Sequence, residues 1–129
     1  MNQEWIINSP LSIPISKNKK FALNLNTYRN AHYAILNKAK RLYEDYMSPK
    51  LDNIPKLKAC SLIYVLYVPT KRKLDVSNVC SVVDKFFSDT LVLNGKLEDD
   101  NYHYLKSITY RFGGIDRTNP RVEIHIIED

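Results

Sequence analysis

The second half of the chain carries the residues that are best suited to chemistry. The basic run Lys71-Arg72-Lys73 is followed closely by Asp75, and the acidic run Glu98-Asp99-Asp100 comes later, after an apolar segment. Basic side chains bind phosphates, and carboxylates bind hard divalent cations such as Mg²⁺. This combination of residue types is typical of a metal-dependent enzyme that acts on nucleic acid.

A helix is predicted between these two charged runs, from about Val76 to Leu91, because apolar residues recur there at every third or fourth position. One polar edge of this helix holds Asn78, Ser81, Lys85 and Asp89. Asp75 directly precedes the helix and is open to two interpretations, a helix cap and a metal ligand. Because the ends of such a helix are roughly 20 Å apart, Asp75 and Asp100 can meet only if residues 98–100 fold back along it.

The other elements are predicted from the spacing of apolar residues. Strands are expected at Trp5–Ile7, Lys20–Leu23, Lys58–Pro69, Tyr104–Phe112 and Arg121–Ile127. A long helix is predicted from Thr27 to Met47, with Asn26 or Thr27 as its cap. The order β-β-α-β-α-β-β indicates one α/β (α+β) domain over residues 1–129, with a mixed β-sheet and two main helices.

Several of these elements carry expectations about burial. The first helix has one apolar stripe, formed by Tyr28, Ala31, Ile35, Leu36, Ala39, Leu42, Tyr43, Tyr46 and Met47. The strand Lys58–Pro69 is apolar on both faces, which is typical of a central strand covered on both sides. Cys60 and Cys80 lie in apolar runs without CxxC spacing, so we expect core thiols of a reducing compartment rather than a disulfide or a zinc site.

The charges of the chain are divided unevenly. The net charge of +5 consists of +9 over residues 1–73 and −4 over residues 74–129. Such a division suits a protein that binds a polyanion and brings a divalent cation to it, although an ordinary soluble domain can also have uneven surface charge. The longest apolar stretch, Leu62–Val68, is too short to cross a bilayer, and no signal peptide is recognised. We therefore expect a cytoplasmic protein with no membrane partner.

Three motifs together resemble the RusA-type Holliday junction resolvases. They are Asp75-Val-Ser-Asn78, Lys85-Phe-Phe-Ser-Asp89-Thr-Leu91 and Asp99-Asp100. The resemblance covers roughly residues 58–127, and the segment Asn24-Leu-Asn-Thr-Tyr28-Arg29 matches more loosely. It implies a RusA-like fold and a small homodimeric endonuclease of bacteria, often encoded by phages or prophages. Such an enzyme cuts four-way DNA junctions by paired nicks in recombination and repair.

The resemblance also implies roles for individual residues. Aspartates would hold Mg²⁺ or Mn²⁺, with Asp75, Asp99 and Asp100 as the ligands. Lys85 would be the essential lysine, and the catalytic residues would be Asp75, Lys85 and Asp100. The basic residues themselves, apart from the resemblance, predict contacts to DNA backbone phosphates. Lys71, Arg72 and Lys73 would hold the phosphates beside the cut, and the basic surface would be extended by Lys19, Lys20 and Arg29. Ser77 and Asn78 would not bind the metal themselves but would position the groups that do.

Ser77 is the main departure from the family pattern, because the family usually has an aspartate at this position. A hydroxyl is a neutral and poorer ligand than a carboxylate, so the site carries one fewer negative charge. An alternative function is therefore a junction-DNA-binding protein with weakened or lost catalysis. A third is a metal-dependent nuclease with looser substrates, such as flaps or replication forks.

Overall fold

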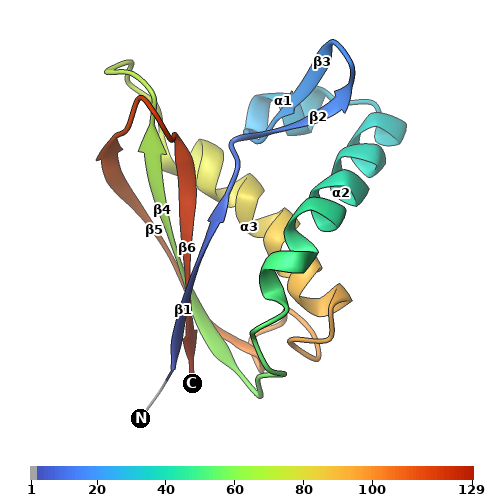
Figure 1. The fold of residues 1–129 in the computed structure, drawn as a ribbon, viewed down its shortest axis with the longest axis vertical. Coiled ribbons are helices and arrows are strands. Elements are labelled where there is room, and N and C mark those ends of the chain that lie inside the picture. The colour runs from blue at the N-terminus through green and yellow to red at the C-terminus, as the bar shows by residue number, and fades with distance from the viewer. Residues whose placement is uncertain (1–2) are drawn as a thin grey trace.

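The structure is a computed structural model that describes residues 3–129, arranged in two layers (Figure 1). One layer is a four-stranded sheet of β1 (Glu4–Ser9), β4 (Cys60–Val68), β5 (Leu105–Ile115) and β6 (Arg121–Glu128). The strand order is β1-β6-β4-β5, with β5 as one edge. Only β4 and β5 run parallel, while β6 is antiparallel to both β1 and β4. The sheet is mixed, as the sequence predicts.

The second layer lies on one face of this sheet (Figure 1). It consists of α1 (Leu25–Asn30), α2 (Tyr33–Met47), the short 3₁₀ helix η1 (Ser48–Leu51), α3 (Val76–Leu93) and the hairpin of β2 (Ser12–Ser16) and β3 (Lys19–Ala22). The mixed α+β fold with two long helices, α2 and α3, is thereby confirmed. Within residues 3–129, no helix is long and apolar enough to cross a membrane.

The core forms where α3 packs onto β4. Alternate residues of β4 point towards the helices and are fully buried, among them Leu62, Tyr64 and Leu66. From α3, Phe86 lies edge-on to Tyr43 of α2 with ring centroids 5.4 Å apart. The same ring lies 6.1 Å from Phe21 of the hairpin. Phe86 therefore links three elements of the helical layer through aromatic contacts.

The predicted helix from Thr27 to Met47 is wrong in its first third, because the chain breaks into α1 and α2. Ala31 has an extended backbone, with φ −75° and ψ 138°, and His32 caps the new helix by accepting the Ala34 N–H at 3.2 Å. The cap of α1 is Asn24, whose side chain accepts the Thr27 N–H at 2.8 Å. Apolar periodicity continues across the break, which is why the sequence pattern conceals it.

Part of the predicted apolar stripe of this helix is also not buried. Ile35 is 39% exposed and Tyr46 is 53% exposed. The buried residues of α2 are Ala39, Tyr43 and Met47. A helix that lies on one side of a small sheet buries a narrow face, so residues at the margin of the stripe reach solvent.

The segment between the first two predicted strands contains a further strand, β2, which is not among the strands predicted from the sequence. Ile13 and Ile15 alternate with polar positions and are buried, and β2 pairs antiparallel with β3. Pro14 is tolerated because this hairpin is a separate two-stranded sheet with free edges. Residues 3–129 therefore contain one more strand than the sequence pattern predicts.

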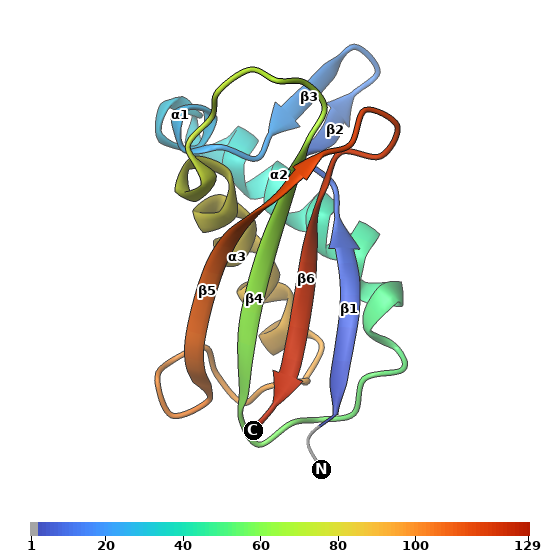
Figure 2. The same ribbon diagram turned by 90° about the vertical axis from the view of Figure 1, so that its left-hand side faces the viewer.

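Helices cover β4 on one face only, so the prediction that this strand is covered on both sides is wrong. Figure 2 shows the sheet with the helices behind it and, within residues 3–129, no second layer in front. Ile63, Val65 and Tyr67 alternate with the buried residues of β4 and are partly exposed. Their neighbours on β6 include Glu123 and His125, opposite Val65 and Ile63 respectively. Apolar residues of β4 are thus covered in part by cross-strand charged groups instead of by a second helical layer.

The two cysteines behave as core thiols, as predicted. Cys60 on β4 and Cys80 on α3 are both buried and form no disulfide. Burial raises the pKa of the Cys60 thiol to about 11 and that of Cys80 to about 12, with a smaller contribution from nearby carboxylates. Both thiols therefore stay protonated and unreactive at neutral pH.

A buried hydrogen bond between Ser9 and Tyr43 gives a stability prediction, since it joins β1 to α2 at 2.8 Å. In Ser9→Ala the Tyr43 hydroxyl loses its partner, and we expect the free energy of unfolding to fall by about 1–3 kcal/mol. The double variant Ser9→Ala/Tyr43→Phe should recover part of this loss, because no unpaired hydroxyl remains. Urea denaturation of the two single variants and the double variant tests this, and strictly additive losses would contradict it.

Candidate nucleic-acid interface

Basic residues from three separate segments lie at one end of the molecule. Figure 2 shows the loop from β4 to α3 at the same end as α1 and β3. Residues 70–74 of this loop supply Lys71, Arg72 and Lys73, all exposed. Lys19 and Lys20 are exposed on β3, and Arg29 is exposed at the end of α1. The structure thus brings together all six residues that the sequence assigns to DNA binding.

Asp75 lies in a polar pocket within this basic end. The pocket is lined by Leu25, Asn26, Arg29, Asn30, Asp75, Ser77 and Asn78. Asp75 occupies the position before α3, yet its side chain makes no capping hydrogen bond. Its exposed carboxylate is therefore available to a ligand, with the cationic Arg29 on the same pocket wall. Asn26 and Asn30 also line a neighbouring pocket that contains Lys19 and Lys20.

Asn78 connects α3 to α1. Its side-chain oxygen accepts the backbone N–H of Leu25 at 2.9 Å, which satisfies one of the free N–H groups in the first turn of α1. Asn78 therefore holds in place the helix that carries Arg29. The sequence assigns Asn78 to the surroundings of a metal ligand, and the structure places it beside Asp75 in the same pocket.

Asp99 and Asp100 lie at the opposite end of α3. They belong to the loop between α3 and β5, where the Asp100 N–H bonds the Asp99 carboxylate at 2.8 Å. Partial burial raises the pKa of Asp100, and Asp99 and Asp89 raise it further. Asp89 lies fourteen residues beyond Asp75, which corresponds to about 20 Å of helix. Within one chain, Asp75 therefore does not meet Asp99 and Asp100.

Lys85 lies between these two groups on the exposed surface of α3. Its ammonium nitrogen is 5.9 Å from the centre of the Tyr28 ring on α1. Ten residues separate Lys85 from Asp75, which is about 15 Å along the helix axis. Lys85 is thus on the same side of the molecule as α1, but it does not contact Asp75.

The residues around Asp75 have the right chemistry for a hard cation but few charges. Their donors are a carboxylate, a hydroxyl and amide oxygens, which suit Mg²⁺ or Mn²⁺. Within residues 3–129, however, no three His, Cys, Asp or Glu side chains lie close enough to hold a metal ion. A single carboxylate binds Mg²⁺ weakly unless a phosphate or a second carboxylate completes the coordination. The Asp75 pocket of one chain would therefore be only part of a metal site.

Sequence reasoning missed Asp84, which has three hydroxyl partners. Its carboxylate accepts hydrogen bonds from Tyr64 at 2.7 Å, Ser88 at 2.9 Å and Tyr110 at 3.3 Å. Burial and the Asp84 charge raise the pKa of Tyr110 to about 12, so its hydroxyl remains a donor at neutral pH. The available signal was an aspartate among the apolar residues of a helix. The network fixes α3 on β4 and β5, which is a structural role.

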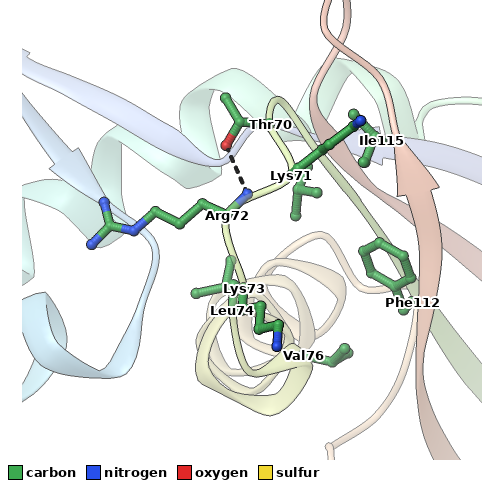
Figure 3. A pocket seen from close by; sticks show the side chains of 9 residues that line it. Thr70, Lys71, Arg72, Lys73, Leu74, Val76, Phe112 and Ile115 are labelled. Atoms are coloured by element: carbon green, nitrogen blue, oxygen red, sulfur yellow. Dashed lines mark hydrogen bonds between the residues drawn. The ribbon is translucent and has the colours of Figure 1, made fainter.

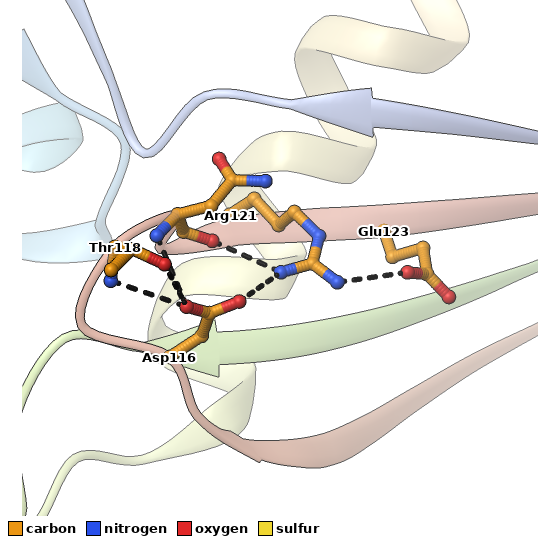
Figure 4. Close-up of polar contacts among 5 residues, drawn as sticks. Asp116, Thr118, Arg121 and Glu123 are labelled. Carbon is orange, nitrogen blue, oxygen red and sulfur yellow. Dashed lines mark hydrogen bonds and ion pairs between the residues drawn. The ribbon is translucent and has the colours of Figure 1, made fainter.

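A second missed cluster lies on the uncovered face of the sheet. The Arg121 guanidinium donates to Asp116 at 2.9 Å and to Glu123 at 3.2 Å (Figure 4), and it lies 4.1 Å from the centre of the Tyr67 ring. Glu123 and Glu4 also bond the two ring nitrogens of His125 at 2.9 and 2.8 Å. These carboxylates are paired with cationic groups of the same chain, so they are poorly suited to hold a metal.

No protein-family model matches the sequence, and no curated protein matches it either.

The Asn78 contact gives the first prediction for this region. In Asn78→Ala the Leu25 N–H loses its acceptor, so amide exchange in α1 should accelerate about tenfold or more, because a partly buried hydrogen bond is worth about 1–1.5 kcal/mol. Asn78→Asp keeps an acceptor oxygen and should retain slow exchange. Hydrogen exchange measured by mass spectrometry on the peptide that spans α1 tests this. Equal exchange in Asn78→Ala and the parent would refute the proposed link.

His125 gives a pH-dependent prediction. Burial alone would lower its pKa, but hydrogen bonds and charge from Glu4 and Glu123 outweigh burial and raise it. The protonated ring therefore stabilises the fold below the unfolded pKa of about 6.5, and this stabilisation is lost as pH rises through the higher folded pKa. Relative to His125→Gln, the parent should lose stability over the range in which the pH rises above about 6.5, the ordinary pKa of histidine. Urea denaturation across this range measures the difference, with the exposed His103→Gln as control.

Proposed function

We propose that this chain is a divalent-metal-dependent DNA endonuclease, of the type that resolves four-way junctions by paired phosphodiester nicks. The observation that supports it best is the position of six exposed cations, from three segments, at the end of the molecule that also carries the exposed carboxylate of Asp75, with Arg29 in the same pocket as Asp75. The resemblance of the Asp75, Lys85 and Asp99-Asp100 motifs to RusA-type resolvases agrees with this function. Such a protein would act in the cytoplasm of a bacterial cell, encoded by the host or by a phage.

The charge of this end supports a polyanionic partner. Within residues 3–129, none of the six cations forms an ion pair with an acidic side chain. Unpaired cations on one surface bind DNA phosphates and release counterions, so affinity falls steeply with salt. The basic side chains also extend over three segments, which matches a duplex backbone better than a single phosphate group.

The proposed metal is Mg²⁺ or Mn²⁺, held at Asp75. When bound, such an ion lowers the pKa of a coordinated water and polarises the scissile phosphate. The residues of the chain contribute the rest. Arg29, which lines the same pocket as Asp75, would hold a phosphate oxygen and orient the DNA backbone. Asn78 would keep α1, and with it Arg29, in the position that this contact requires.

A homodimer would bring the two separated acidic groups together. Asp75 and the Asp99-Asp100 pair lie at opposite ends of α3, so two antiparallel copies of this helix could place Asp75 of one chain beside Asp99 and Asp100 of the other. Lys85, midway along the helix, would then face the same shared surface and stabilise negative charge on the phosphate. Two such sites, related by a two-fold axis, would match the symmetry of a four-way junction.

A second candidate is a junction-binding protein without cleavage activity. Ser77, at a position where the family usually has an aspartate, and the single carboxylate in the Asp75 pocket both favour it. Salt-sensitive binding is common to both candidates, so only metal-dependent nicking separates them.

The test is cleavage of a labelled synthetic four-way junction with Mg²⁺, with Mn²⁺ and with EDTA. We expect paired nicks that require metal, and we expect Asp75→Asn, Asp100→Asn and Lys85→Ala each to reduce the rate by roughly 100-fold or more. Asp45→Asn on α2 is the matched control and should cleave normally. Tight junction binding with no nick in either metal would establish the binding protein instead.

Mixing the chains tests the shared site. If Asp75 and Asp100 act from different chains, a mixture of Asp75→Asn and Asp100→Asn proteins forms heterodimers in which one site keeps both aspartates. Such a mixture should nick one strand of the junction, although neither variant cleaves alone. No recovery after subunit exchange, verified by native mass spectrometry, would mean that each site is built within one chain.

A further inference from the structure

A second pocket at the basic end contains apolar side chains that the proposed cleavage chemistry does not use. It has a volume of about 270 Å³ and lies between the end of β5, the loop after β4 and the start of α3 (Figure 3). We name it the Phe112 pocket. It is lined by Val68, Thr70, Lys71, Arg72, Lys73, Leu74, Val76, Phe112 and Ile115.

Large apolar groups in the Phe112 pocket are open to solvent. Phe112, Ile115 and Leu74 are 57%, 46% and 45% exposed. Phe112 pairs in register with Leu66 and Ile115 with Val68, two residues of β4 that the helical layer buries. The helical layer does not extend far enough to cover β5 at this point. Exposed apolar side chains that adjoin one another mark a binding surface more often than isolated ones do.

Cations border this apolar surface. Lys71, Arg72 and Lys73 are among the residues that line the pocket, and the Arg72 backbone N–H donates a hydrogen bond to the Thr70 hydroxyl at 3.3 Å (Figure 3). Figure 3 also shows the Lys71 side chain extending towards Ile115, whereas the Arg72 side chain points away from Phe112. A complementary ligand has a flat apolar part joined to anionic groups, which is the chemistry of a nucleotide.

We propose that the Phe112 pocket binds a single nucleobase that has left the base stack, with the ring of Phe112 as its stacking partner and Lys71 and Lys73 on the adjoining phosphates. This site deepens the proposed function and rests on it, because the ligand is a base at the branch point of the junction. Arg72, which also lines the neighbouring pocket beside Asn24, would hold the backbone on the side of α1.

The size of the pocket and its position favour an unstacked base. The volume of about 270 Å³ is slightly below the roughly 300–1,000 Å³ that is typical of ligand pockets. A pocket of this size suits one base better than a larger group. A base within a duplex is covered on both faces by its neighbours, so only a base at a branch, gap or end can stack on Phe112 without a large unstacking cost. The pocket would therefore add a preference for branched DNA to the uniform attraction of the basic residues.

The test uses four-way junctions with 2-aminopurine at each branch-point position, a matching linear duplex and a short single strand that contains the same probe. With the parent protein, we expect a change in 2-aminopurine fluorescence at one branch-point position. Phe112→Ala should abolish it and weaken junction binding by about 5- to 100-fold, the range found when a base loses an aromatic stacking partner. Duplex binding should change by less than about twofold, because phosphate contacts remain.

Two sets of variants keep the test specific. Phe112→Trp should restore the fluorescence change and Phe112→Leu should not, since both preserve an apolar side chain but only one provides an aromatic face. Tyr102→Ala, which removes a 79% exposed aromatic ring outside the pocket, is the matched control and should bind as the parent does. Lys71→Gln should lower the magnitude of the salt slope by about one, whereas Lys106→Gln should leave it unchanged.

The outcomes separate this proposal from the proposed function. Junction cleavage or binding that is unaltered in Phe112→Ala, with no fluorescence change, would overturn the base site and leave the nuclease standing. Absence of junction binding by the parent, together with Phe112-dependent binding of the single strand, would support the base site and refute the junction function. Absence of both would overturn both.

Discussion

The packing of α3 across β4 is the constraint on which the rest of this structure depends. Phe86 connects α3 to α2 and to the β2–β3 hairpin, and the Asp84 carboxylate connects it to Tyr64 and Tyr110. Because α3 is one continuous helix of 18 residues, this packing fixes its two ends about 27 Å apart. The loop that directly precedes the helix lies at the basic end, and the loop that directly follows it, with Asp99 and Asp100, lies at the opposite end.

Because the two ends of α3 are far apart, the positively and negatively charged parts of the sequence contribute to different ends of the molecule. The positive half of the sequence reaches the basic end through β3, α1 and the loop after β4, while the Asp99-Asp100 pair lies at the far end of α3. Because α3 separates the two acidic groups of the motif within one chain, only a second chain can bring them together. For the proposed cleavage reaction, a dimer would then be a chemical requirement and not merely a consequence of symmetry.

Much of the fold could be predicted from the sequence, because period-two and period-three-to-four spacing is a local property. This holds for α3, β4, β5 and β6, and for the buried cysteines. The break before His32 and the strand β2 could not be predicted, since both depend on short-range hydrogen bonds and pairing that leave the apolar spacing unchanged. The convergence of Lys19, Arg29 and Lys71 depends on contacts between distant segments, which spacing does not encode. Asp84 escaped notice for a similar reason, because its partners come from two other strands.

The edge position of β5 has a consequence for how the protein behaves at high concentration. An eleven-residue strand with one unpaired side offers backbone N–H and C=O groups to any other extended chain. In this protein, Lys106 and Arg111 lie along that strand, register shifts interrupt its pairing with β4, and Gly114 adopts a φ of +144° near its end. Charge and irregular geometry thus discourage another strand from pairing with this edge. The sheet, although covered on one face only, can then associate with other molecules through side-chain contacts instead of through its backbone.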